Sequence, residues 1–268
     1  MVAPKHCVQF DVRLLVHMAQ AMVERVRAAG CTAPIGLHLD HGNSFEECKL
    51  AIDNGFSSVM IDGSGCTLEE NIRLTRSVVE YAKPFGVMVE GEVGALSGSE
   101  DPDEAAKAMR YTDPEEAARM VEQSGADCLA VSVGTIHGLN KAENGIRFTG
   151  LKTDLIERID QLLGGYPLVL HGCSSLPQKY VNMINAYGGH LAPMIGIPDA
   201  CLSEVCKTAV CKINIASDGW IPSTAITRKV LAEHPEAIDN RLCRAEIRKE
   251  LKGIYCHKMD LFQSTGKG

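Results

Sequence analysis

Three histidines in this sequence stand directly before a glycine, and each follows a short apolar run. They are His41, His137 and His171. A lone histidine in such a place is more often a packed or solvent-facing residue than a ligand, but three of them at three strand ends could meet at one point. Three imidazole nitrogens with a fourth position open are a common donor set for a catalytic zinc ion, which acts as a Lewis acid on a substrate oxygen. The pattern predicts such a Zn²⁺ site.

Carboxylates accompany these histidines. Asp40 precedes His41, so its side chain would lie beside the metal and the substrate as a general acid/base, or else would cap the next helix or orient a histidine. Asp62 and Glu92 end neighbouring strands, where we expect them either to hold a second cation, divalent or monovalent, or to hydrogen-bond the ligating histidines. An ordinary loop acid is the alternative for Asp62. His38 shares the strand face of Asp40 one pleat deeper and is expected to be a buried core histidine.

Two segments rich in small residues could bind phosphate through backbone N–H groups. Gly172-Cys173-Ser174-Ser175 follows the fifth expected strand, and Asn214-Ile215-Ala216-Ser217 follows the sixth. A Gly–Ser turn by itself is a weak indication. The loops after the last strands of a βα barrel are, however, where a phosphate site is usually built.

Short apolar runs alternate with amphipathic stretches, which is typical of repeated βα units around a parallel sheet. The six expected strands are Ile35–Asp40, Ser58–Asp62, Val87–Glu92, Cys128–Val133, Leu168–His171 and Cys211–Ile215. The expected helices are Val12–Ala29, Phe45–Asn54, Leu68–Lys83, Pro114–Ser124, Leu151–Leu163, Pro177–Tyr187, Ser223–His234 and Leu242–Asp260. No linker or change of composition divides the chain, so residues 1–268 are expected to form a single domain.

Six parallel strands could form an open doubly wound sheet or most of an eight-stranded barrel. Barrel enzymes collect catalytic residues from the ends of many strands, whereas open sheets use one switch point. Nearly every expected strand here ends in a reactive side chain. The sequence therefore favours an α/β fold of the TIM (β/α)8 barrel type.

Composition narrows the class of protein. The chain has 268 residues, 45% of them hydrophobic and 23% charged, with a net charge of −7. These values are typical of a globular protein and unfavourable for nucleic-acid binding, and no apolar run is long enough to span a membrane. The eleven cysteines are scattered and odd in number, which favours reduced, buried thiols. No apolar segment of secretory type opens the chain, so we expect a cytoplasmic protein.

Seven motifs occur in an order that resembles the class II, zinc-dependent fructose-bisphosphate aldolases. They are LHLDHG, VMIDGS, VEGEVG, VSVGTIHG, PLVLHGCSS, YGG and KINIASDG, and the resemblance runs from about Pro34 to the C-terminus. It implies an eight-stranded βα barrel that reversibly joins dihydroxyacetone phosphate to an aldehyde, usually glyceraldehyde 3-phosphate. It also implies a small phosphorylated sugar as substrate and a homo-oligomer. The family begins with two further strands, which residues 1–12 are too short and too polar to replace.

The resemblance also implies a role for each matching residue. His41, His137 and His171 match the zinc ligands, Asp40 matches the acid that serves the reacting hydroxyl, and Asp62 and Glu92 match further metal-associated carboxylates. The segments that hold dihydroxyacetone phosphate in the family match Gly138, Gly172, Cys173, Ser174, Asn214, Ile215, Ala216 and Ser217.

Two positions depart from the fructose-bisphosphate pattern. Ala216 stands where those enzymes usually have an Asp that touches a sugar hydroxyl, and Trp220 stands in place of an Arg that binds the distal phosphate. Tagatose-bisphosphate-type members also carry Ala at the first position. The resemblance therefore implies a class II aldolase that cleaves fructose 1,6-bisphosphate or a related ketose bisphosphate. The alternatives are a tagatose-bisphosphate-type aldolase and a truncated, non-catalytic remnant of the family.

Overall fold

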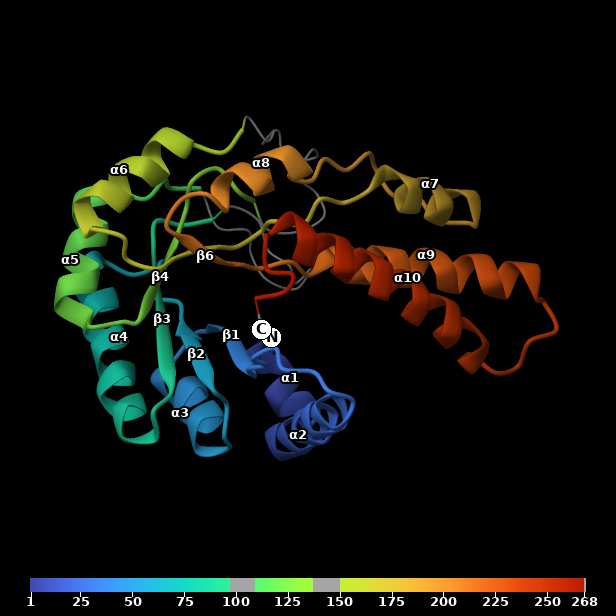
Figure 1. Ribbon diagram of the computed structural model, residues 1–268, viewed down its shortest axis with the longest axis horizontal. Helices are drawn as coiled ribbons and strands as arrows, with labels where there is room; N and C mark the ends of the chain where they lie inside the picture. The colour runs from blue at the N-terminus through green and yellow to red at the C-terminus, as the bar shows by residue number, and fades with distance from the viewer. Residues whose placement is uncertain (97–108, 137–149, 268) are drawn as a thin grey trace.

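Six parallel strands form one curled sheet, in which each strand pairs with the next along the chain (Figure 1). The computed structural model describes residues 1–96, 109–136 and 150–267. The strands are β1 (His38–Gly42), β2 (Ser58–Ile61), β3 (Met88–Val93), β4 (Cys128–Val131), β5 (Leu168–Leu170) and β6 (Val210–Ile213). All six strands predicted from the apolar runs are therefore confirmed, and the sheet has the shape of a half-barrel.

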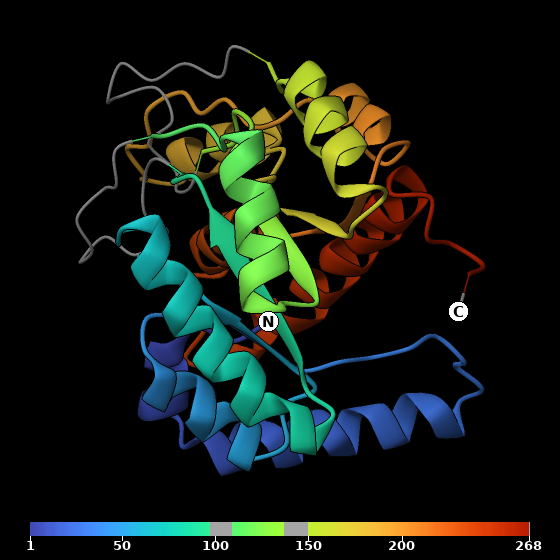
Figure 2. The same ribbon diagram turned by 90° about the vertical axis from the view of Figure 1, so that its left-hand side faces the viewer.

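Four helices follow the first strands and pack side by side against the outer face of the sheet (Figure 2). They are α3 (Phe45–Asp53), α4 (Leu68–Ala82), which continues into the 3-10 turn Lys83–Phe85, α5 (Pro114–Ser124) and α6 (Thr153–Leu163). Their first turns are set locally. Ser44 accepts the Glu47 N–H, Thr67 and Glu70 form a capping box, and Asp113 caps a helix that begins with proline.

The second half of the chain contributes α7 (Gln178–Ala186), α8 (Asp199–Val205), α9 (Ser217–Glu233) and α10 (Arg241–Leu261). Helices α9 and α10 pack against each other as a hairpin that extends away from the sheet (Figure 1). Helix α8 was not predicted, and α9 was predicted to begin only at Ser223. Gly219 and Pro222 disfavour a helix interior. Burial of Ile221 and Pro222 in the second turn outweighs that preference, so α9 begins six residues earlier.

The first residues form two helices and one contact with the sheet. Helix α1 (Pro4–Gln9) was not predicted, whereas α2 (Val12–Ala28) was. Val2 forms a parallel bridge to Leu39, in which its N–H donates to the His38 carbonyl and its carbonyl accepts the Asp40 N–H, both at 2.9 Å. This single residue lies along the outer edge of β1, where a neighbouring strand would pair.

The two faces of the sheet differ in polarity, because the outer face is apolar and the inner face carries polar and charged side chains. Most core residues lie between the sheet and the helices, in two large clusters. The strands contribute their outward-facing residues to these clusters, such as Leu39, Val89 and Leu170. The inner face is mixed, because it holds Met60 beside charged groups. The curl brings β1 and β6 so close that Lys212 Nζ lies 3.2 Å from His38 Nε2. The polar inner face is where the site is built.

Candidate active site

The candidate residues form one layer on the inner face, at the carboxyl ends of the strands. Successive side chains of a strand alternate between faces, so a residue two positions after an inner-facing residue also faces inward. Each candidate stands two positions beyond a buried or half-buried inner residue of the same strand or its extension. The pairs are His38 and Asp40, Met60 and Asp62, Glu90 and Glu92, Val169 and His171, and Lys212 and Asn214.

His41 reaches the same place through a break in this alternation. A regular strand would direct His41 away from the face of Asp40. The register between β1 and β2 shifts after Leu39, because three residues of β1 oppose two residues of β2, and His41 has a φ of 54°. Such a bulge with left-handed backbone turns the side chain back toward the interior. The next residue must be glycine, since a Cβ on Gly42 would lie 2.8 Å from the Met60 carbonyl oxygen.

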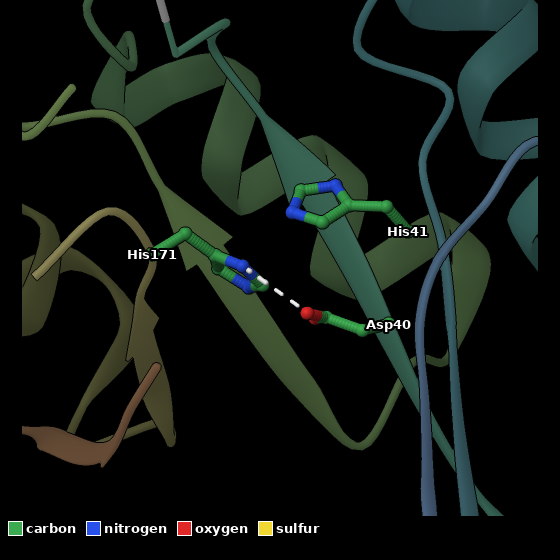
Figure 3. Close-up of side chains that lie close together, drawn as sticks. All are labelled: Asp40, His41 and His171. Carbon is green, nitrogen blue, oxygen red and sulfur yellow. Dashed lines mark ion pairs between the residues drawn. The ribbon is translucent and has the colours of Figure 1, made fainter. Parts of the chain in front are cut away.

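Asp40, His41 and His171 converge at this layer (Figure 3). The imidazole rings of His41 and His171 have their centroids 4.6 Å apart, and His171 Nδ1 lies 3.8 Å from Asp40 Oδ1. One possible ligand atom from each of the three residues lies within 4.8 Å of the others, and the same holds for His41, Asp62 and Glu92. Imidazole nitrogens and carboxylate oxygens are donors that suit a zinc ion.

The hydrogen bonds of His171 fix its tautomer. Its Nε2 lies 2.7 Å from Glu90 Oε1, so this nitrogen carries the proton and donates it, while Nδ1 accepts from Asn214 Nδ2 at 3.1 Å. Burial lowers the pKa of His171 below its ordinary value, although the bond to Glu90 opposes that shift. A neutral ring with Nδ1 as its basic nitrogen is the form that binds a metal. This nitrogen lies 3.8 Å from Asp40 Oδ1, and a cation bound there would take the lone pair that now accepts from Asn214 Nδ2.

Glu90 also belongs to this layer, although it was not among the predicted site residues. Besides His171, its carboxylate accepts a hydrogen bond from Lys212 Nζ at 2.7 Å, and His38 Nε2 lies 3.7 Å away. Burial alone would raise the pKa of Glu90, but the bond from His171 and the charge of Lys212 hold it well below its ordinary value. The motif V-E-G-E-V contains a signal, because two glutamates at alternating positions of a strand share one face.

His38 is buried, as predicted. It is 7% exposed, and its Nδ1 pairs with Ser58 Oγ at 2.8 Å. Burial and the nearby charge of Lys212 lower its pKa to about 4, which keeps the ring neutral. It contributes to the polar layer beneath the candidate metal centre rather than to the centre itself.

The carboxylates of Asp62 and Glu92 lie beside His41 Nδ1. Asp62 Oδ2 accepts a hydrogen bond from His41 Nδ1 at 3.0 Å, and Asp62 Oδ1 accepts two from Ser64, through its N–H at 3.0 Å and its hydroxyl at 2.6 Å. Glu92 Oε2 lies 3.8 Å from the same His41 nitrogen. Burial lowers the pKa of His41, but Asp62, Glu92 and Asp40 outweigh it and raise the value to about 9. The same negative surroundings favour a bound cation.

The segment after β5 lies against the segment after β6. Ser174 Oγ accepts the Ala216 N–H at 3.2 Å, and the Cys173 N–H donates to the Asn214 carbonyl at 3.2 Å. The Cys173 thiol is fully buried in the core, and Ile215 packs against the same core cluster. Gly172 has a φ of 65°, in the left-handed region that glycine adopts without strain.

Helix α9 begins within this pair of segments. Ala216 is its N-cap residue, and Ser217 is the first helical residue and is buried. Trp220 follows one turn later and is half-exposed, at 50%. The N–H groups at the start of a helix favour an anion.

Asn214 connects the two parts of the site. Its Nδ2 donates to Asp40 Oδ1 at 3.0 Å, across the opening between β6 and β1, and also lies beside His171. The predicted residues His137 and Gly138 lie outside the described residues. Apart from these two, the structure brings the predicted site residues to the same end of the sheet.

The curled parallel sheet and the layer of histidines and carboxylates at its carboxyl end, which could hold a metal ion, define an α/β class of protein with a candidate metal centre. Comparison with known proteins identifies the family. The model of the family "Fructose-bisphosphate aldolase class-II" matches residues 1–267. The fructose-bisphosphate aldolase of Treponema pallidum is 43% identical over 96% of this chain and 81% of its own length. That of Giardia intestinalis is 42% identical over 87% of this chain and 71% of its own length.

Solved structures agree with these relatives. The YdjI aldolase from Escherichia coli superimposes with a TM-score of 0.71 and 28% identity, over 99% of this chain and 81% of that one. A putative fructose-1,6-bisphosphate aldolase from Coccidioides immitis gives a TM-score of 0.66 and 27% identity, over 95% and 81%. The chain belongs to the class II fructose-bisphosphate aldolase family, and it is a carbon–carbon lyase. Among the described residues, no helix is long and apolar enough to cross a membrane.

Proposed function

We propose that this enzyme reversibly cleaves fructose 1,6-bisphosphate, or a related ketose bisphosphate, to dihydroxyacetone phosphate and glyceraldehyde 3-phosphate. The observation that carries the proposal is the convergence of Asp40, His41 and His171 on one point of the inner face. His41, His171 and His137 are the proposed ligands of a catalytic Zn²⁺. When bound, this ion would stabilise the negative charge that develops on the ketone oxygen as the carbon–carbon bond breaks.

Asp40 is the proposed general acid/base. Its side chain is 18% exposed, which leaves one carboxylate oxygen within reach of a substrate while Asn214 Nδ2 holds Oδ1 at 3.0 Å. In cleavage it removes the proton from the hydroxyl of the carbinol carbon, and the electrons of that O–H bond form the aldehyde as the carbon–carbon bond breaks. In condensation it returns the proton to the new hydroxyl.

Asp62 and Glu92 are proposed to support this centre in one of two ways. Asp62 orients His41 through the bond to Nδ1, and the buried Glu92 carboxylate adds negative charge at 3.8 Å from the same nitrogen. A second cation, divalent or monovalent, would find its oxygen ligands in the same two side chains.

The dihydroxyacetone phosphate moiety is proposed to lie against the two segments after β5 and β6. Gly172, Cys173 and Ser174 belong to the first segment, and residues 214–217 belong to the second. Gly138, which lies outside the described residues, is proposed as a further contact of the same moiety. The start of α9 and the close contact between Ser174 and Ala216 support a phosphate group here. Holding the ketone at a fixed place beside the metal lowers the entropic cost of the reaction.

A tagatose-bisphosphate-type substrate is the second candidate, and Ala216 and Trp220 favour it. The Ala216 side chain cannot accept a hydrogen bond from a sugar hydroxyl, as an Asp would. The Trp220 ring carries no charge to pair with a phosphate, as an Arg would. The half-exposed Trp220 indole lies one turn into α9, so an uncharged ring occupies the position expected to bind a distal phosphate.

We propose further that the sheet is part of a closed barrel. The consecutive parallel order of the six strands and the site at their carboxyl ends support an eight-stranded TIM barrel. We also propose a cytoplasmic homo-oligomer, as the family resemblance implies.

Removal of the metal tests the proposed reaction. Dialysis against a chelator should abolish cleavage of the ketose bisphosphate, and addition of zinc or cobalt should restore it. His171→Ala should lose bound zinc and activity together, whereas His190→Ala, which changes an exposed histidine, should keep both. Cleavage that survives both the chelator and His171→Ala would rule out the zinc mechanism.

A further inference from the structure

A buried lysine connects the last helix of the described chain to the segment after β5. Lys258 lies in the last turn of α10 and is 4% exposed. Its Nζ donates to Ser175 Oγ at 2.5 Å and lies 3.2 Å from Asp199 Oδ1 and 3.3 Å from Asp218 Oδ2. A lysine is almost never buried to this extent unless it is paired. Three oxygens from three different elements supply that pairing.

One of these partners holds the backbone of the same segment. The two carboxylate oxygens of Asp218, in the first turn of α9, accept the N–H groups of Ser175 at 3.0 Å and Leu176 at 2.8 Å. Leu176 has a φ of 50°, which a side chain of this size rarely adopts. The Asp218 carboxylate therefore fixes a strained turn directly after Ser174.

The opposite side of the segment is held by close backbone packing. The Ile197 N–H donates to the Ser174 carbonyl at 3.0 Å. A Cβ on the neighbouring Gly196 would lie 2.2 Å from the carbonyl carbon of Ser175, so only glycine fits there. The backbone of Ser174 and Ser175 thus has little conformational freedom as long as Lys258, Asp199 and Asp218 keep their contacts.

Asp199 completes the cluster. Its Oδ1 accepts the Ser175 hydroxyl at 2.8 Å, and its Oδ2 pairs with His257 Nε2 at 2.7 Å. Burial raises the pKa of Asp199, but the bonds from His257 and Ser175 and the charge of Lys258 lower it to about 2. Without Lys258, the two carboxylates would repel each other and any phosphate bound nearby.

We propose that Lys258 is a positioning residue for the phosphate of dihydroxyacetone phosphate. It acts through Ser175 and Asp218, because it holds the segment that contains Ser174 and balances the negative charge of two carboxylates beside the bound phosphate. This inference rests on the proposed function of that segment. It assigns to the C-terminal helix a part in substrate binding that no site motif of the sequence indicates.

The test compares Lys258→Met with Lys252→Met, which removes an exposed lysine from the same helix. Calorimetric titration with dihydroxyacetone phosphate measures affinity without turnover, and steady-state cleavage gives kcat and KM. Lys258→Met should weaken the affinity and raise KM by about tenfold, because a displacement of the segment by less than 1 Å should cost less than the roughly hundredfold effect of a full 1 Å shift. Its kcat and zinc content should stay close to those of Lys252→Met.

Ser175→Ala provides a second route to the same answer if Lys258→Met does not fold. It removes the hydroxyl between Lys258 and the segment but keeps the backbone bonds, so it should weaken the affinity in the same direction by a smaller factor. Unchanged affinity for dihydroxyacetone phosphate in both variants would overturn the role of Lys258. A parallel loss of kcat and of bound zinc in Lys258→Met would overturn it as well. A wild-type enzyme that binds dihydroxyacetone phosphate but cleaves no ketose bisphosphate would instead overturn the proposed function alone.

Discussion

The metal end and the phosphate end of the site rely on different groups, side chains at the first and backbone at the second. At the metal end, carboxylates and imidazoles at the ends of β1, β3 and β5 form hydrogen bonds with one another on the inner face of the sheet, as Glu90 does with His171. At the phosphate end, backbone groups after β5 and β6 are the proposed contacts, and side chains from α9 and α10 hold them in place, as Asp218 holds the Ser175 N–H. The first end depends on the types of a few residues, whereas the second depends on how distant helices pack.

This difference follows from the cost of burying charge. A buried carboxylate or ammonium is stable only if it is paired and hydrogen-bonded. Inside the sheet, Glu90 meets this condition with His171 and Lys212, so one substitution there leaves a partner unpaired. A backbone N–H needs only one acceptor, and several side chains share the task of keeping it in position. Substitutions should therefore affect chemistry at the first end and affinity at the second.

Among substitutions that keep the metal, Asp40→Ala is expected to have the largest effect on turnover. Asp40→Ala should keep the bound metal but lower kcat by about 10²–10⁴, the usual contribution of a positioned acid/base. The measurements are kcat for cleavage and the zinc content of the purified variant. Loss of zinc together with activity would show that Asp40 instead supports the metal, and Glu24→Ala, at an exposed glutamate of α2, is the control for removing a surface charge.

The pair Ala216→Asp and Trp220→Arg should shift specificity at the phosphate end. It restores a hydroxyl acceptor and a charge-assisted phosphate contact, each worth about 1.5–3 kcal/mol, so kcat/KM for fructose 1,6-bisphosphate should rise by about 10²–10⁴ if the two add. Exchange of a proton of dihydroxyacetone phosphate should hardly change. Equal cleavage before and after the substitutions would mean that these positions do not set specificity.

Glu90→Gln should have the smallest effect of the three. The amide keeps the shape of the side chain but removes the charge that holds Nε2–H of His171 and Lys212, and loss of such a partner costs about 10–100-fold in metal affinity. Zinc affinity by competition with a chelator, and the visible spectrum of the cobalt-substituted enzyme, measure this directly. Glu122→Gln, at an exposed position of α5, is the matched control. A zinc affinity equal to that of this control would show that Glu90 serves the fold alone.

Local patterns determined much of the architecture. The six strands follow from short apolar runs bounded by small residues, and most helices follow from capping residues and amphipathic spacing. The same patterns placed Asp40 and His171 at strand ends, because a period of two and a turn signal are enough to say where a strand stops. The identity of these residues then limits the chemistry to metal and acid/base catalysis.

Tertiary structure decided what alternation and spacing do not contain. The bulge at His41 arises from pairing with β2, the extension of α9 through Pro222 arises from burial, and Lys258 meets Ser175 only because α10 folds back over the segment after β5. Each of these contacts joins residues that are distant in the chain or overrides a local preference. Such contacts depend on packing free energy summed over the whole fold, whereas the sequence pattern reports only the preferences of neighbouring residues.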